Sequence, residues 1–110
     1  MSGRAMPDEP VVRDNAEARR FELAAEGRVA FAEYNRLSGG IVLTHTEVPP
    51  ELEGRGFASA IFRFVVARLR ERGETVMPVC PVFALWLKKH AEAHDVVHPS
   101  YRSALGIPAG

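Results

Sequence analysis

The sequence lacks the features that would place it in a membrane or an oxidising compartment. Its 110 residues include one cysteine, Cys80, so no internal disulfide can form. No apolar run approaches the roughly 20 residues that a membrane-spanning helix needs. Residues 1–10 have no apolar core of a secretory signal. These absences predict a cytoplasmic protein that does not enter a membrane.

The sequence also lacks an excess of charge of either sign. Lys+Arg and Asp+Glu number 14 each, which gives a formal net charge of zero. Proteins that bind nucleic acids usually have a basic excess or patch, so no nucleic-acid partner is expected. Hydrophobic residues make up 46% and charged residues 25%, which is typical of a globular domain.

The chain is long enough for one domain and too short for two. Residues 1–10 contain two prolines and no periodicity, which predicts a disordered leader. The folded domain is expected over residues 11–98. Beyond His94 the periodicity fades, and Pro99 and Gly106 predict a loose tail over residues 99–110.

Three strands are predicted in the first half. Residues 20–24 and 29–34 flank the turn Glu26-Gly27 and are expected to form a hairpin. The β-branched segment 41–48 follows a turn at 38–40. The short spacing predicts an antiparallel meander.

The second half has helical periodicity. Apolar residues recur on one stripe of a helix, and Gly73 is a good helix stop. The stripe comprises Phe57, Ile61, Phe64, Val65 and Leu69. Residues 75–80 are expected to form a fourth strand, parallel to 41–48 because a helix connects the two. Pro81 suits the first turn of a second helix, whose buried face is expected at Val82, Phe83, Trp86, Leu87 and His90. The order β-β-β-α-β-α is that of a mixed α/β fold.

The strongest chemical feature is Glu53-Gly54-Arg55-Gly56-Phe57-Ala58, between a strand and a helix. Glycines let the backbone approach a ligand, and free N–H groups at a helix N-terminus form an anion site. The segment has no Gly-Lys-Ser/Thr ending of a Walker A loop, and Ser59 stands where a Rossmann fingerprint has its third glycine. A purely structural strand-to-helix turn is the alternative.

This segment resembles motif A of the GNAT acyltransferase superfamily, Q/R-x-x-G-x-G/A. Together with His45-Thr46-Glu47-Val48-Pro49, Val79-Cys80-Pro81 and Leu87-Lys88-Lys89-His90, it is similar to a family of small single-domain GNAT-like proteins, over roughly residues 21–97. The resemblance implies a minimal GNAT-like fold with splayed parallel strands, and N-acetyltransferase activity. It also implies that acetyl-CoA or coenzyme A is the cofactor.

By the same resemblance, backbone amides of residues 54–58 hold the coenzyme A pyrophosphate, and pantetheine runs along residues 46–48. The residues expected to bind the cofactor are Thr46, Val48, Glu53, Gly54, Arg55, Gly56, Phe57, Ala58 and Ser59. One position departs from the motif: Glu51 stands where Gln or Arg is usual. Arg55 is expected to compensate, either directly or by offsetting Glu51 and Glu53.

Three residues are candidates for catalysis. His45 and Glu47 share one face of a strand, and either can serve as general base, although a cross-strand polar pair is the alternative. Cys80 is expected near the N-terminus of the second helix, which favours a thiolate nucleophile. A small buried hydrophobe is the alternative for this cysteine. His45 is a further candidate as the base for Cys80.

These observations predict an acyl-CoA-dependent N-acyltransferase whose acceptor is an unknown amine, on a protein or peptide if the groove is open. A coenzyme A-binding module with little or no turnover is the first alternative, and a domain that retains only the fold is the second. The repeat His90, His94, His98 is not expected to bind metal, because Pro99 opposes a continuous helix. A monomer or weak homodimer is expected.

Overall fold

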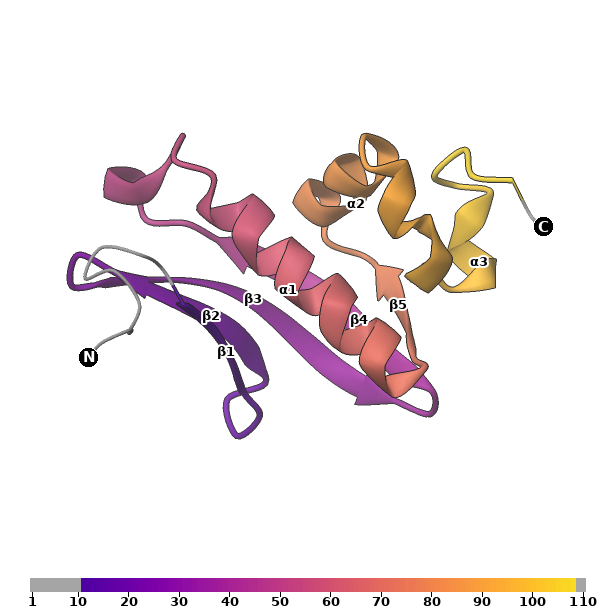
Figure 1. Ribbon diagram of the computed structural model, residues 1–110, viewed down its shortest axis with the longest axis horizontal. Coiled ribbons are helices and arrows are strands. Elements are labelled where there is room, and N and C mark those ends of the chain that lie inside the picture. Colours follow the sequence, from indigo (N-terminus) through magenta and orange to yellow (C-terminus); the bar gives the residue numbers. More distant parts are fainter. Residues whose placement is uncertain (1–10, 109–110) are drawn as a thin grey trace, which may run out of the picture.

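The computed structural model describes residues 11–108 as a five-stranded sheet with helices (Figure 1). The leader predicted for residues 1–10 lies outside the described residues. The sheet has the order β1-β2-β3-β4-β5. The elements in chain order are β1 (Val11–Asn15), β2 (Arg20–Ala25), β3 (Arg28–Leu37), β4 (Gly40–Glu47), η1 (Pro50–Leu52), α1 (Phe57–Arg72), β5 (Thr75–Pro78), α2 (Pro81–Lys88), η2 (Ala91–Val96) and α3 (Pro99–Arg102).

The predicted meander is confirmed, since β2, β3 and β4 pair antiparallel in succession. Strands β4 and β5 pair in parallel, as the strand–helix–strand order predicted. The edge strand β1 was not predicted, because its five residues alternate poorly between apolar and polar. A side-chain contact holds it: the Tyr34 hydroxyl donates to Asp14 Oδ1 at 2.6 Å. Burial of the hydroxyl, together with the smaller effect of its hydrogen bond to Asp14, raises the pKa of Tyr34 to about 12.

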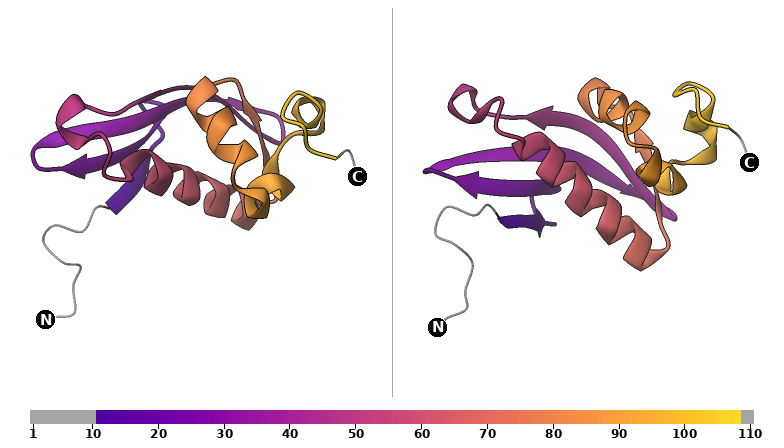
Figure 2. Two further views of the ribbon diagram at one scale, coloured as in Figure 1. Left: turned by 90° about the horizontal axis from the view of Figure 1, so that it is seen from above. Right: turned by 45° about the horizontal axis from the view of Figure 1, so that its top comes forward.

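Helix α1 crosses one face of the sheet (Figure 2). Gly73 follows its last residue and has a left-handed conformation. The Gly73 N–H donates to the carbonyls of Leu69 and Arg70. The buried residues of the helix follow the predicted stripe, except that Phe62 and Val66 are buried where Phe64 was expected. The core lies between this helix and the sheet, and its largest fully buried side chains are Phe62, Phe83, Leu23, Leu43, Leu52, Ile61, Leu87, Val65, Val76 and Cys80.

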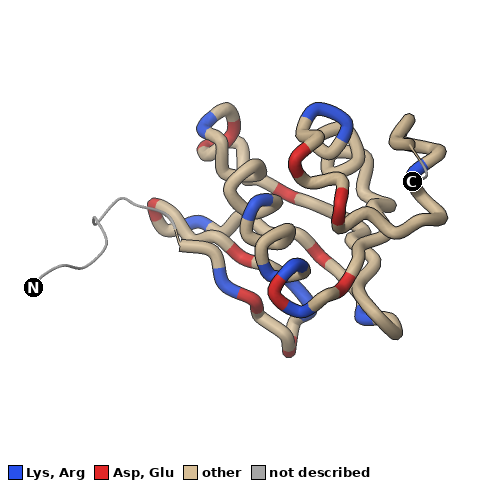
Figure 3. Tube along the Cα trace, turned by 45° about the vertical axis from the view of Figure 1, so that its right-hand side comes forward, with Lys and Arg blue, Asp and Glu red and all other residues tan. Residues whose placement is uncertain are grey.

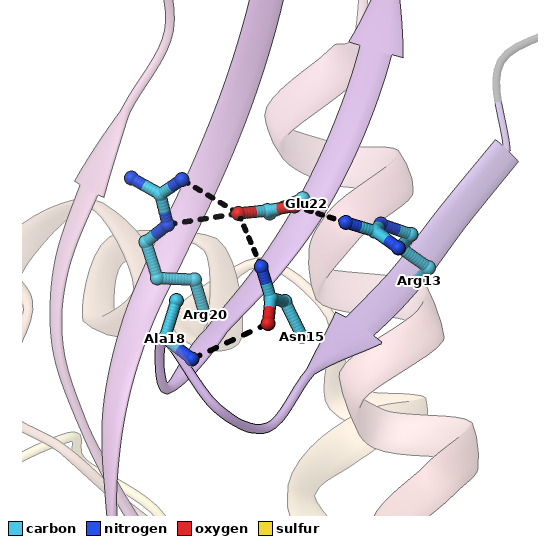
Figure 4. Close-up of polar contacts among 5 residues, drawn as sticks. All are labelled: Arg13, Asn15, Ala18, Arg20 and Glu22. Atoms are coloured by element: carbon cyan, nitrogen blue, oxygen red, sulfur yellow. Dashed lines mark hydrogen bonds and ion pairs between the residues drawn. The ribbon is translucent and has the colours of Figure 1, made fainter.

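On the other face of the sheet, Glu22 joins β1 and β2 by side-chain contacts (Figure 4). Its carboxylate accepts from Arg20 at 2.6 Å, from Asn15 at 3.2 Å and from Arg13 at 3.3 Å. Burial pushes the pKa of Glu22 upward, but hydrogen bonds from Arg20 and Asn15 outweigh burial, so the net pKa is lowered. The Arg20 guanidinium also lies 4.3 Å from the centroid of the Phe31 ring.

Helix α2 begins at Pro81, as predicted, but its buried face is narrower than expected. Phe83 and Leu87 are buried, whereas Val82 is 51% exposed. The helix stops at Lys88, so His90 and His94 lie beyond it and bind its carbonyls instead. His90 Nδ1 is 2.7 Å from the Trp86 oxygen, and His94 Nε2 is 2.6 Å from the Leu87 oxygen.

The prediction of a loose tail from residue 99 is wrong for the described part, residues 99–108. Helix α3 begins there, with the His98 side chain accepting from Ser100 N–H at 3.0 Å. Leu105 and Ile107 then return to the core, at 9% and 5% exposure. Apolar burial by residues after the helix, which periodicity did not reveal, explains the difference. Within residues 11–108, no helix has the length and apolar character needed to span a bilayer.

Candidate functional site

The site begins at a β-bulge in β4. Tyr34 pairs with Leu43, whereas the preceding residue of β3, Glu33, pairs with His45. Thr44 is therefore an extra residue in β4, and its hydroxyl donates to the Glu33 carbonyl at 3.3 Å. Beyond a bulge of this kind, the side chains of a strand exchange faces relative to simple alternation.

The bulge decides which β4 side chains face the core. Before it, Ile41 and Leu43 are buried on the α1 side. After it, Thr46 pairs with the buried Ala32 and so faces the α1 side as well. His45 and Glu47 consequently point to the opposite face of the sheet, where both are exposed.

Strands β4 and β5 separate just beyond the bulge. Their pairing ends at Leu43 and Pro78. The Cys80 N–H donates to the Leu43 oxygen at 2.9 Å, and the chain then turns into α2. Within residues 11–108, residues 44–47 of β4 have no β5 partner. The backbone of this stretch is free on that side to bind an extended ligand.

A cavity of about 340 Å³ lies beside this open edge. It reaches from β4 to the N-terminal ends of α1 and α2. Its lining residues are Thr46, Val48, Leu52, Glu53, Gly54, Gly56, Phe57, Ala58, Ser59 and Val82. The volume is at the lower end of the range for small-molecule sites, roughly 300–1,000 Å³.

The N-terminus of α1 supplies the polar end of the cavity. Gly54 and Gly56 have φ of +76° and +81°, which other residues adopt only with strain. These conformations turn the chain from η1 into the helix. Gly56 is the N-cap residue of α1, and no side chain forms a capping hydrogen bond there. A helix leaves its first N–H groups without partners inside the helix. Those donors and the helix dipole favour an anion here.

The structure brings the predicted cofactor residues together with one exception. Arg55 does not line the cavity. Its guanidinium bonds to Glu26 at the β2–β3 turn and lies 5.2 Å from the Phe57 ring centroid. Two lining residues, Leu52 and Val82, were not predicted. Val82 is exposed although it is apolar, because its side chain forms part of the open cavity wall.

Glu51 is neutralised differently from the expectation. Arg28 forms a two-point ion pair with it, at 3.0 Å from Nε and 3.2 Å from Nη2. Arg55 is paired with Glu26 rather than offsetting Glu51 or Glu53. The β2–β3 turn supplies both new partners, and short-range sequence patterns do not reveal contacts of this kind.

The three catalytic candidates are divided between the two faces of the sheet. Cys80 is 2% exposed, and its Sγ lies 3.3 Å from Thr46 Oγ1 on the cavity side. On the other face, His45 Nε2 lies 3.2 Å from Glu47 Oε1. The structure therefore brings His45 to Glu47 but places Cys80 on the opposite side of β4. Among the described residues, the side-chain partner of the thiol is the Thr46 hydroxyl, which is a weak base.

A comparison with protein-family models matched residues 20–96 to the model described as GCN5-related N-acetyl-transferase. The match spans β2 to η2 and includes the glycine turn and Cys80. A search of curated proteins found no match. The sheet, parallel at β4–β5 and antiparallel elsewhere, agrees with the fold of that family.

Proposed function

Because the chain belongs to the GCN5-related N-acetyltransferase family, we propose that it transfers an acetyl group from acetyl-CoA to an amine. The observation that carries this proposal is the cavity between the open edge of β4 and the uncapped N-terminus of α1. A polar end suited to phosphate and an apolar wall meet in one space, as a ligand with a diphosphate and a pantetheine arm requires.

The residues present fit coenzyme A. The N–H groups of residues 57–59, at the start of α1, would donate hydrogen bonds to the pyrophosphate oxygens. A Cβ placed on Gly54 or Gly56 would meet no heavy atom within 4 Å, so space for a ligand is open above the turn. Val48, Phe57 and Val82 would contact the pantetheine arm. When bound, acetyl-CoA supplies the activated acetyl thioester.

The transfer step would occur at the gap between β4 and β5. Those backbone N–H groups of residues 44–47 that point away from β3 have no β5 partner, and they would polarise the thioester carbonyl. An amine approaching from the open face would meet His45 and Glu47, one of which would take its proton. The amine nitrogen would form a bond to the carbonyl carbon, the carbon–sulfur bond would break, and coenzyme A would leave as a thiolate that takes up a proton.

A second route would pass through Cys80. Its sulfur would attack the thioester carbon, and coenzyme A would leave as the thiol after taking up the thiol proton of Cys80. The amine nitrogen would then attack the acetyl carbon, and the cysteine sulfur would leave and take up the proton that the amine loses. The position of Sγ beside Thr46 on the cavity side supports access to the thioester. The separation of Cys80 from His45 by the sheet favours direct transfer, because the thiol has no strong base in hydrogen-bond contact among the described residues.

One observation favours a coenzyme A-binding module as the second candidate function. A turn of only four residues, 16–19, joins β1 to β2. The described chain thus has no helix there that would wall an acceptor groove. The acceptor side is consequently open, which suits a protein or peptide substrate if turnover occurs, and ligand binding without turnover if it does not.

Replacing Gly56 with Ala tests the cavity assignment. The substitution imposes a Cβ at φ +81°, so the glycine turn should shift and the amides should lose their alignment. Calorimetric titration should show micromolar binding of acetyl-CoA to the unmodified chain and at least about tenfold weaker binding to the variant, the loss expected for one charge-assisted hydrogen bond.

Gly39→Ala is the matched control. Gly39 has φ +82°, and a Cβ there also meets nothing within 4 Å. It lies between β3 and β4, outside the cavity lining. Both variants should lose about 1 kcal/mol of stability, but only Gly56→Ala should lose affinity. Equal affinity in the two variants, or no binding by the unmodified chain, would refute the assignment.

A further inference from the structure

Two ion pairs connect the β2–β3 turn to the loop that precedes α1. Arg28 reaches Glu51 with two nitrogens, at 3.0 and 3.2 Å. Arg55 bonds to Glu26 from the other direction. Each of the four side chains is between 44% and 58% exposed. Exposed pairs contribute only about 0–1 kcal/mol to stability, so either pair can open at little cost to the fold.

Both pairs flank the phosphate end of the cavity. Arg55 stands between Gly54 and Gly56, which line the cavity, yet its guanidinium is turned toward Glu26. Glu51 directly precedes Leu52, another lining residue. Arg28 and Arg55 are therefore each paired with a carboxylate of the chain itself beside the proposed anion site.

The carboxylates remain charged at neutral pH. The hydrogen bond from Arg55 lowers the pKa of Glu26, and the hydrogen bond from Arg28 lowers the pKa of Glu51. With Glu53 also present, three acidic side chains surround two basic ones in this small region. Acidic and basic positions are interspersed over the described part of the chain (Figure 3). Within the described residues, the cavity lining contains no Lys or Arg, and both neighbouring arginines are paired.

We propose that Arg28 and Arg55 are phosphate ligands of coenzyme A, and that Glu51 and Glu26 are internal anions which these phosphates displace. The inference rests on the proposed function. A guanidinium binds phosphate in the same two-point manner as carboxylate. The diphosphate and the 3′-phosphate of coenzyme A together carry more negative charge than the two carboxylates that they would displace. Each displaced carboxylate is already exposed, so it returns to water without a large desolvation cost.

This exchange has a signature that a merely structural clamp lacks. Removing the acid, by Glu51→Gln, frees Arg28 and should tighten coenzyme A binding by about threefold, which corresponds to the upper part of the range for exposed pairs. Removing the base, by Arg28→Gln, should weaken binding by about tenfold. A clamp that only shapes the loop would be broken by both variants, and both would then weaken binding.

The experiment is a calorimetric titration of the full chain and its variants with coenzyme A, dephospho-coenzyme A and pantetheine. Glu26→Gln and Arg55→Gln form the second pair and should behave like the first. Arg70→Gln is the control, because it breaks a similarly exposed pair, Arg70 to Asp95 at 2.7 Å, outside the cavity lining. Thermal unfolding of each variant checks that the fold is retained.

Opposite changes for Glu51→Gln and Arg28→Gln with coenzyme A, and none with the phosphate-free pantetheine, support the exchange. Retention of the effect with dephospho-coenzyme A assigns it to the pyrophosphate, and loss assigns it to the 3′-phosphate. Changes of the same sign, or unchanged affinity, overturn the exchange while leaving the proposed function intact. Failure of the unmodified chain to bind coenzyme A overturns both.

Discussion

Cys80 is the single residue whose chemistry separates the two transfer routes. Its thiol is buried and contacts the Thr46 hydroxyl. A reactive cysteine usually has an adjacent base and access to solvent. The described surroundings supply neither, since His45 lies on the other face of the sheet. The contact with Thr46 fits a packing role beside the thioester better than a nucleophilic one.

We expect Cys80→Ala to retain turnover within about tenfold of the unmodified enzyme, equivalent to about 1.4 kcal/mol in the barrier. Loss of a buried sulfur should lower stability by about 1–2 kcal/mol. Steady-state acetylation of an amine acceptor measures the first effect, and chemical denaturation the second. Abolished turnover in Cys80→Ala, joined with an acetylated Cys80 in the intact mass of the unmodified enzyme, would establish the covalent route instead.

At the scale of elements, the junction of β4 with β5 depends on the absence of a side chain at Gly40. A Cβ built on Gly40 would lie 1.9 Å from the carbonyl oxygen of Thr75. That oxygen belongs to the backbone of the paired strand, so it cannot move without shifting β5. Close approach of the two backbones here sets the position from which the strands later separate.

Gly40→Ala should therefore lower the free energy of unfolding by roughly 3 kcal/mol, at the upper end of the usual cost of overpacking. The adjacent Gly39→Asn is the control, because asparagine tolerates the left-handed conformation and a Cβ there meets no atom within 4 Å. Urea denaturation of both variants makes the comparison. Equal stability of the two would show that β5 moves freely, contrary to the packing described.

The element scale also explains which parts of the fold could be predicted. Helix α1 was recognisable because its apolar stripe and Gly73 are local signals. The glycine turn was recognisable for the same reason. The bulge at Thr44 could not be predicted, because it is a difference in register between two strands rather than a pattern within one. Simple alternation correctly predicts that His45 and Glu47 share one face of β4. It does not predict that this is the face opposite α1, because the bulge changes which residues face the core.

The partners of charged side chains in ion pairs were the other feature that the sequence could not predict. The departure of Glu51 from the motif was visible in the sequence, but its pairing with Arg28, 23 positions away, was not. Arg55 likewise pairs across the fold with Glu26. Long, exposed side chains choose partners by tertiary proximity, which no local spacing encodes. Eight of the nine predicted cofactor residues nevertheless line one cavity, since all of them except Arg55 do so.

At the scale of the whole molecule, the C-terminal segment closes the side of the domain beyond β5. The His98 N–H donates to the Val76 oxygen at 2.9 Å, and Val97 forms a bridge with the same residue. The Arg102 guanidinium donates to the His94 carbonyl at 2.8 Å. These bonds place Leu105 and Ile107 against the core. The segment covers an edge that would otherwise be open for pairing.

Removing residues 99–110 should therefore destabilise the domain by about 3–5 kcal/mol, the sum expected for two buried aliphatic side chains. That is a large part of the roughly 5–15 kcal/mol available to a small domain. Leu105→Ala and Ile107→Ala should each lose about 2 kcal/mol, whereas Leu85→Ala, at a side chain 55% exposed, should lose little. Urea denaturation measures all four.

If the truncated chain unfolds at the same urea concentration as the full one, the segment is the loose tail that the sequence suggested. If it unfolds earlier and the single variants account for the difference, these residues belong to the folded domain, and the domain boundary lies beyond residue 98.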